Sequence, residues 1–195
     1  MHLDGVAFTL ARSGSPNRYV LRDQVFSWAG TVSGLGHVEM VYPTERSDHG
    51  GLFLGASVTG VGVPASSYGG REYGGRPSLA DGELVLAGNP ARLSRSSWGL
   101  TRRARALRIH AGDRSYAYAE VRDRRRHELR RPGACVRTTR SARRNPRTIA
   151  GSVHGLADGV DVALAVLLEG VDTRSLSLRG ALLSAPGRLL VRLGD

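Results

Sequence analysis

The chain has 195 residues, 28 basic and 17 acidic side chains, a formal net charge of +11 and 41% hydrophobic residues. These values predict a single globular domain over 1–195 and exclude a wholly disordered chain. The single cysteine excludes an intrachain disulfide and any metal site built from several cysteines.

The positive charge is concentrated in one region. Eighteen of the 28 basic residues lie between Arg92 and Arg147, where there are only four acids, whereas the rest of the chain has ten arginines and thirteen acids. Such a regional excess predicts a surface for an anionic partner. The chain has no lysine, so a GC-rich coding sequence that merely enriches arginine on a solvated face is the alternative. The clustering favours the first interpretation, because coding bias would spread arginine evenly.

Short strands are expected in the first part of the chain. Residues 5–11 and 18–28 are rich in β-branched and aromatic side chains, and residues 37–42 alternate polar and apolar. Residues 52–62 are expected to form a strand with bulges, despite their glycines.

A glycine-rich flexible surface loop is expected over residues 64–80. It contains the repeat YGGRE–YGGRP, and its tyrosines Tyr68 and Tyr73 are candidates for stacking on a nucleotide or headgroup. A short strand over residues 83–87 is then expected to end at Pro90.

An arginine-rich antiparallel meander is predicted over residues 92–154. The clearest strand spans residues 115–121, where Tyr116, Tyr118 and Glu120 alternate with alanine and valine. Gly112-Asp113 and Pro132-Gly133 supply turn residues between neighbouring strands.

One helix is predicted over residues 159–169. Asp158 suits the N-cap, Asp161 lies in the first turn, and Gly170 can end the helix. The run from Val162 to Leu168 is apolar on every side, which indicates a buried helix. At seven residues this run is far shorter than the roughly 20 that a transmembrane helix needs. The fold class is therefore α+β and mostly β, an antiparallel meander or β-barrel packed around one buried apolar helix.

Two segments resemble the tubby-like superfamily, in particular the LURP-one-related and phospholipid-scramblase-like proteins. RYVLRDQVFSW (18–28) resembles their opening strand pair, and GLADGVDVALAVLLEGVD (155–172) resembles their late apolar helix. The resemblance implies a β-barrel closed around a central hydrophobic helix and phospholipid headgroups as ligands. The chain departs from the family in its glycine-rich region and in about 23 residues after the helix. A pleckstrin-homology-like barrel is the competing interpretation.

Motifs for catalysis or cofactor binding are weak. His37 and Glu39 have the His-x-Glu spacing of zinc deaminases, but the Pro-Cys-x-x-Cys that completes such a site is missing. Cys135 has arginines nearby in the sequence that could lower its pKa, although a small core residue is the favoured interpretation. No cofactor and no metal are therefore expected, and the protein is expected not to be an enzyme.

The predicted function is non-catalytic recognition of an anionic partner at an arginine patch. The favoured partner is phospholipid headgroups at a membrane surface, because guanidinium binds phosphate through paired hydrogen bonds. Nucleic acid, with tyrosines as stacking platforms, and acidic protein are the alternatives. The expected location is cytoplasmic, with peripheral contact to a membrane. The candidate anion-binding residues are Arg102, Arg103, Arg105, Arg122, Arg124, Arg125, Arg126, Arg130 and Arg131, and the candidate stacking residues are Tyr68, Tyr73, Tyr116 and Tyr118.

Overall fold

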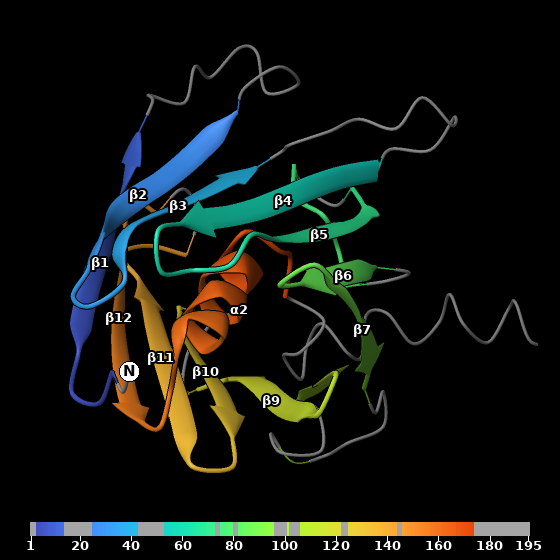
Figure 1. Ribbon diagram of the computed structural model, residues 1–195. Helices are drawn as coiled ribbons and strands as arrows, with labels where there is room; N and C mark the ends of the chain where they lie inside the picture. Colours follow the sequence, from blue (N-terminus) through green and yellow to red (C-terminus); the bar gives the residue numbers. More distant parts are fainter. Residues whose placement is uncertain are drawn as a thin grey trace, which may run out of the picture.

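Twelve antiparallel strands form one closed barrel in the computed structural model of the chain (Figure 1). The structure describes residues 3–13, 25–42, 53–72, 75–79, 82–95, 101, 106–121, 125–143 and 146–173. Each strand pairs with the next along the chain, and β12 pairs with β1 to close the barrel. The strands are β1 (Ala7–Ser13), β2 (Phe26–Val32), β3 (Gly36–Tyr42), β4 (Phe53–Gly60), β5 (Ser66–Arg71), β6 (Glu83–Leu86), β7 (Asn89–Ser94), β8 (Leu107–Ala111), β9 (Arg114–Glu120), β10 (Arg126–Arg131), β11 (Ala134–Arg140) and β12 (Thr148–Gly155).

The antiparallel meander gives the barrel two different ends. Tight connections at residues 33–35, 61–65, 87–88, 112–113 and 132–133 join neighbouring strands at one end, which we call the turn end. Every odd-numbered strand finishes at the opposite end, which we call the loop end. Because connections in a meander alternate between ends, the described residues that flank the connections after β7, β9 and β11 all lie at the loop end.

The predicted helix is present as α2 (Gly159–Glu169). The Asp158 side chain accepts hydrogen bonds from the amides of Val160 (3.0 Å) and Asp161 (3.2 Å), and Asp161 accepts one from the Asp158 amide (2.8 Å), which completes a capping box. The helix ends at Gly170 as predicted, but the glycine has a right-handed φ of −78°. Glycine fits this position because of limited space and not because of its backbone conformation. A Cβ at residue 170 would lie 3.0 Å from Met40 Sδ.

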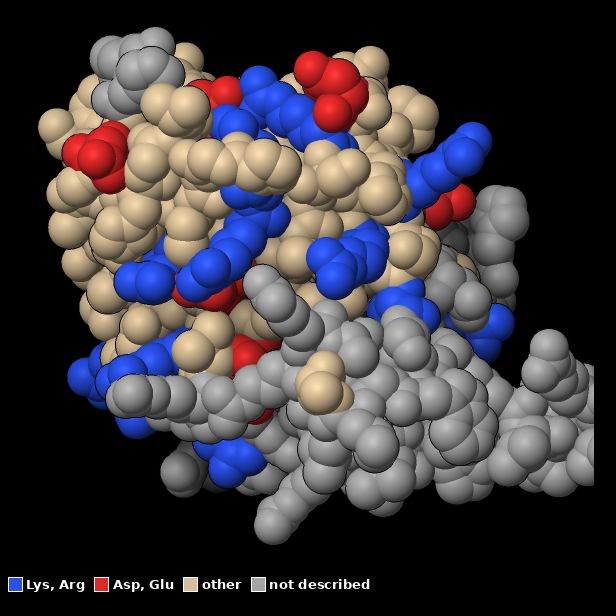
Figure 2. All heavy atoms as spheres, turned by 90° about the horizontal axis from the view of Figure 1, so that it is seen from below, with Lys and Arg blue, Asp and Glu red and all other residues tan. Residues whose placement is uncertain are grey.

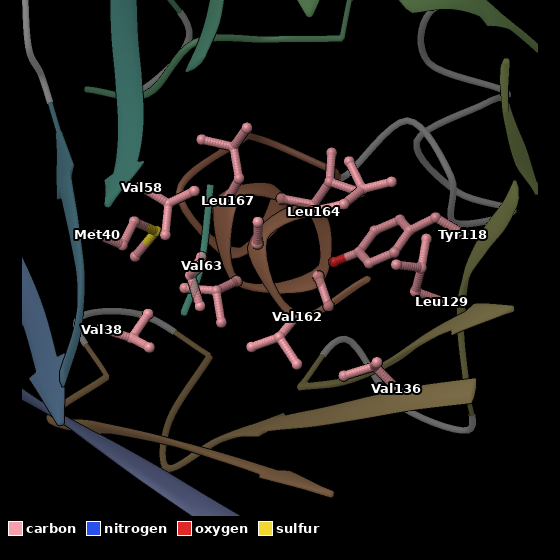
Figure 3. Close-up of a cluster of buried hydrophobic side chains, with 14 of the residues drawn as sticks. Val38, Met40, Val58, Val63, Tyr118, Leu129, Val136, Val162, Leu164 and Leu167 are labelled. Carbon is pink, nitrogen blue, oxygen red and sulfur yellow. The ribbon is translucent and has the colours of Figure 1, made fainter. Parts of the chain in front are cut away.

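Helix and strands contribute to one hydrophobic cluster. All residues from Asp161 to Glu169 are buried. Figure 3 shows Val162, Leu164 and Leu167 of α2 facing side chains of β3, β4, β9, β10 and β11. The alternation predicted for β9 is confirmed, since Tyr116 and Tyr118 are buried while Ala117 and Ala119 are partly exposed. A barrel and a mostly β composition are thus confirmed.

The flexible loop expected at residues 64–80 is corrected by the structure. Residues 66–71 form β5, which pairs with β4 and β6, and the Tyr68 hydroxyl donates a hydrogen bond of 2.9 Å to the Ser78 carbonyl. Gly70 permits this contact, because a Cβ there would lie 2.5 Å from the same carbonyl oxygen. Residues 66–71 are thus part of the sheet, and Gly70 allows the backbone at Ser78 to approach closely.

Pro90 also has a different role from the one expected. Ala87 and Gly88 both have positive φ (51° and 79°), as two-residue hairpin turns require, so the chain reverses before the proline. Pro90 then pairs with Val85 as the second residue of β7. The prediction that Pro90 ends the strand region was wrong, because a hairpin turn before it was not recognised.

Candidate functional site

The outer wall of strands β8 to β11 carries a group of arginines on outward positions. Arg108, Arg126, Arg130 and Arg137 alternate with the buried residues Leu107, Ile109, Leu129 and Val136, which point into the core. Period-two alternation thus places the guanidinium groups on one surface, which we call the arginine wall. Figure 2 views the molecule from below and shows several separate basic groups among uncharged and acidic residues.

The strand register brings the arginines of β10 and β11 together. Arg137 lies opposite Glu128, and Arg126 lies opposite Thr139. Small residues of β12 continue the wall, with Ser152 opposite Arg137 and Ala150 opposite Thr139. A hollow forms over these small side chains between the longer arginines.

This hollow is an open pocket of about 610 Å³, a volume within the roughly 300–1,000 Å³ of small-ligand sites. Three arginines, Arg126, Arg130 and Arg137, and one carboxylate, Glu128, are among its lining residues. Thr139 and Ser152 add hydroxyl groups. The pocket therefore combines an excess of guanidinium with hydroxyl donors, a composition that suits a phosphate or another oxyanion.

Glu128 organises two of the arginines. Arg130 donates to both of its carboxylate oxygens (2.5 and 3.0 Å), and Arg137 donates to Oε2 (2.9 Å). Partial burial alone would raise the pKa of Glu128, but the hydrogen bonds from the two arginines outweigh it, so the pKa lies below its usual value. The carboxylate therefore stays ionised at neutral pH and holds both guanidinium groups at the pocket wall.

Arg126 is the cation of the pocket with most freedom to bind a ligand. Among the described residues no carboxylate forms an ion pair with Arg126 or with Arg108, and both side chains are exposed. An unpaired arginine can offer both guanidinium edges to an incoming oxyanion. Among the predicted site residues, Arg126 is thus a pocket arginine with no ion pair to a described carboxylate.

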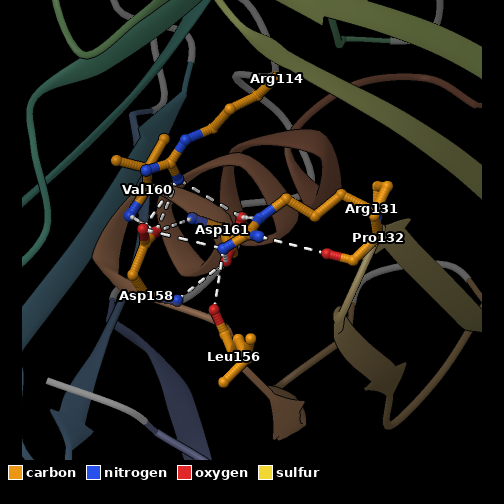
Figure 4. Close-up of polar contacts among 7 residues, drawn as sticks. All are labelled: Arg114, Arg131, Pro132, Leu156, Asp158, Val160 and Asp161. Carbon is orange, nitrogen blue, oxygen red and sulfur yellow. Dashed lines mark hydrogen bonds and ion pairs between the residues drawn. The ribbon is translucent and has the colours of Figure 1, made fainter.

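Arg131 belongs to a different group of contacts. It donates to both carboxylate oxygens of Asp161 (2.8 Å each) and to the Leu156 carbonyl (2.8 Å) at the beginning of α2 (Figure 4). Arg114 donates to Asp158 (3.0 Å to Oδ1) in the same cluster. These arginines fix the helix start to β9 and β10, so the structure corrects the assignment of Arg131 to the anion-binding set.

Of the remaining predicted arginines, one lies within the described residues and five lie outside them. Arg125 is exposed at the loop end, where it precedes β10. Five other candidates lie outside the described residues, namely Arg102, Arg103, Arg105, Arg122 and Arg124.

The tyrosines predicted to stack on bases are in the core. Tyr68, Tyr116 and Tyr118 are 1%, 2% and 0% exposed, so no ring face is open to a ligand. The alternation that made Tyr116 and Tyr118 conspicuous is the alternation of an inward-facing row. The stacking prediction is corrected for these three residues, and Tyr73 lies outside the described residues.

A buried polar cluster at the end of α2 was not predicted. The Glu169 carboxylate accepts hydrogen bonds from His127 Nδ1 (2.9 Å), Thr138, Arg140 and Tyr118 (3.4 Å). Burial alone would raise the pKa of Glu169, but the charge of Arg140 and then that of His127 hold it far below its usual value. Because an ionised carboxylate only accepts hydrogen bonds, Nδ1 of His127 must carry a hydrogen.

Two arginines complete this cluster at the C-terminal end of the helix. Arg140 and Arg76 donate to the Glu169 carbonyl (2.9 and 3.3 Å), and Arg76 lies 5.2 Å from the ring centre of Tyr42. Positive charge at a helix C-terminus is favourable. The only sequence signal was an acidic residue at the end of an otherwise apolar helix, which demands a buried partner.

Cys135 lies beside the pocket, opposite Arg130, and is partly exposed rather than a core residue. Burial and then the negative charge of Glu128 raise its pKa, and the nearby arginines do not overcome these effects. The structure thus gives no support to an activated nucleophile.

Because Glu128 raises the pKa of Cys135, the reactivity of the Cys135 thiol tests whether Glu128 lies beside it. Replacing Glu128→Gln removes the negative charge and should increase the rate of alkylation by iodoacetamide at pH 7.5 severalfold, because a lower thiol pKa gives more thiolate. The measurement is the pH dependence of alkylation, with Glu120→Gln on β9 as the matched control. Identical profiles for wild type and Glu128→Gln would contradict the arrangement.

Within the described residues no group of three or more His, Cys, Asp or Glu side chains is placed to hold a metal ion. None of the described helices has the length and apolar character to cross a bilayer. Comparison of the chain with protein-family models, with curated proteins and with solved structures finds no match.

Proposed function

We propose that this protein is a non-catalytic binding protein that recognises phospholipid headgroups at a membrane surface through the arginine wall. The observation that carries the proposal is the composition of the pocket, whose lining includes three arginines, Arg126, Arg130 and Arg137, and one carboxylate. Guanidinium groups bind phosphate oxygens through paired, charge-assisted hydrogen bonds.

The distribution of ion pairs supports this choice of surface. Arg114, Arg131 and Arg140 are neutralised by the carboxylates of α2 and its cap. Arg130 and Arg137 share one carboxylate, and no described carboxylate pairs with Arg126. The arginines whose positive charge is not balanced by a described carboxylate therefore lie on the outer wall of the barrel. Near an anionic membrane each such residue contributes about 1 kcal/mol.

The architecture supports the resemblance to the tubby-like superfamily. We infer that the twelve-stranded barrel is packed around α2, as the resemblance implies, since the helix is buried and its side chains join the cluster of the strands. On this view the helix supplies the core, and the outer wall is left for recognition. Nucleic-acid binding has less support, because the stacking candidates Tyr68, Tyr116 and Tyr118 are buried and offer no stacking platform.

Vesicle flotation tests the proposal. Purified, nuclease-treated protein should float with vesicles rich in phosphatidylserine at 0.15 M salt and not with neutral vesicles. Replacing Arg126→Ser and Arg137→Ser together should weaken binding about tenfold or more, since two cations near an anionic surface contribute about 2 kcal/mol. Raising the salt should weaken the wild type further.

Arg92→Ser is the matched control, because Arg92 is also exposed but lies on β7, three strands from β10. This control should bind like the wild type. Absence of flotation at low and at physiological salt would overturn the proposal. Copurifying material that absorbs at 260 nm would indicate that the arginine wall binds nucleic acid instead of phospholipid.

A further inference from the structure

Exposed apolar side chains occur at both ends of the barrel. Val25 (63% exposed) and Phe53 (37%) lie at the loop end, where β2 and β4 begin. Val61 (89%) and Leu156 (55%) lie at the turn end, in the connections after β4 and β12. The charges around each pair distinguish the two ends.

The loop end combines its apolar residues with cations. Arg126 begins β10, and Arg143 and Arg147 are exposed between β11 and β12. The Arg12 amide donates to the Arg147 carbonyl (2.8 Å), which places this segment beside the end of β1. Strands β10, β11, β12, β1, β2, β3 and β4 are consecutive neighbours in the barrel. The rim of the loop end is therefore one arc with arginines on one half and exposed apolar side chains on the other.

A cluster of aromatic rings supports the apolar half of the arc. Phe26 follows Val25 directly, and its ring centre lies 5.6 Å from that of Tyr42 and 6.4 Å from that of Trp28. The Arg12 guanidinium lies over the Phe26 and Trp28 rings, at 5.7 and 6.0 Å from their centres. The residue after Val25 thus belongs to a packed ring cluster, which Arg12 contacts.

The turn end lacks a comparable excess of charge among the described residues. Its arginines Arg114 and Arg131 are paired with Asp158 and Asp161. Asp4, in the segment before β1, and Asp113, in the turn between β8 and β9, add negative charge. Arg131, which donates to the Leu156 carbonyl, is thus already neutralised by Asp161.

We propose that the loop end is the face that docks on the anionic bilayer, with Val25 and Phe53 entering the interface and Arg126, Arg143 and Arg147 at the headgroups. This inference rests on the proposed function and adds an orientation to it. The loop end then faces the bilayer, and the pocket beside Arg126 lies close to its surface. Basic charge together with inserted apolar groups gives firmer membrane binding than either alone.

Apolar insertion and electrostatic attraction respond differently to salt, which provides the test. The double variant Val25→Ser and Phe53→Ser should partition about tenfold more weakly into phosphatidylserine vesicles, as expected for removing partly exposed apolar side chains. Its remaining binding should be more sensitive to salt, because only the charge contribution is left. The matched control is Val61→Ser with Leu156→Ser, which should bind like the wild type.

A fluorescence measurement locates the face directly. In a Cys135→Ser background, an environment-sensitive dye attached after Val25→Cys should shift to the blue when phosphatidylserine vesicles are added. The same dye attached after Val61→Cys should not shift. Together the two positions report which end enters the interface.

The outcomes separate this inference from the proposed function. Wild-type flotation with unchanged binding of the Val25 and Phe53 variant, and no dye shift at residue 25, would overturn the orientation and leave the arginine wall as the binding surface. If the Val61 and Leu156 variant loses binding instead, the proposed orientation is wrong and the turn end is the face that docks. Wild type that fails to float would overturn both proposals.

Discussion

Replacing Glu169→Gln is expected to lower the free energy of unfolding by about 3 kcal/mol at pH 7. The variant keeps the size of the side chain but removes the negative charge that lies between Arg140, His127 and Thr138. Arg140 would then remain buried without a carboxylate, which costs far more than losing an exposed pair. Urea denaturation followed by circular dichroism measures the change.

Glu128→Gln is the matched control for this substitution. It also removes a carboxylate that binds two arginines, but these side chains are more than half exposed. Such surface pairs contribute about 0–1 kcal/mol. Equal losses of stability in the two variants would contradict a special role of the buried cluster.

The same cluster predicts a pH dependence. The pKa of Glu169 is lower in the folded protein than its usual value of 4.5. A depressed folded pKa contributes stability above the unfolded pKa, and this contribution is lost as the pH falls towards the folded pKa. Between pH 7 and pH 3 the wild type should therefore lose about 2 kcal/mol more than Glu169→Gln. Parallel pH profiles of the two proteins would contradict the shifted pKa.

Replacing Leu167→Ala should have the second large effect, a loss of about 3–5 kcal/mol in the free energy of unfolding. Leu167 is fully buried in α2 and belongs to the cluster that includes Val38, Val58 and Leu129 (Figure 3). The substitution removes three carbon atoms from a site whose neighbours belong to both the helix and the strands, so a cavity remains.

Chemical denaturation measures this change, with Val61→Ala as the control. Val61 is 89% exposed, so its truncation should change stability by less than about 0.5 kcal/mol. If Leu167→Ala fails to fold, Leu167→Val gives a smaller cavity and a measurable curve. A loss as small as that of the control would show that the helix is not part of the core.

The elements with strong local signals were predicted correctly. Asp158, Asp161 and the apolar run of α2 specify a helix through contacts within a few residues, and its limits match the structure. The meander between β8 and β12 was equally clear, because alternation and turn residues are local properties. Local signals failed in β5, where glycine was interpreted as a loop signal although Gly70 allows close contact with the Ser78 backbone.

The candidate site was predicted only in part. The sequence identified the arginine-rich region, but charge alone does not tell whether an arginine meets solvent or an internal carboxylate. Arg131 and Arg140 bind carboxylates 30 and 29 residues away, whereas Arg126 pairs with no described carboxylate. Such long-range partners are set by barrel closure, which no local pattern contains.

The sequence by itself determined a mostly β domain, one buried helix with its caps, and a concentration of cations in one region. Those features depend on alternation, capping and composition, which act over a few residues. Only the tertiary structure decided that twelve strands close into a barrel, that the tyrosines face inward and that Glu169 collects a buried cluster. It also decided which arginines remain available on the outer wall, because strand register and barrel closure fix the partner of each side chain.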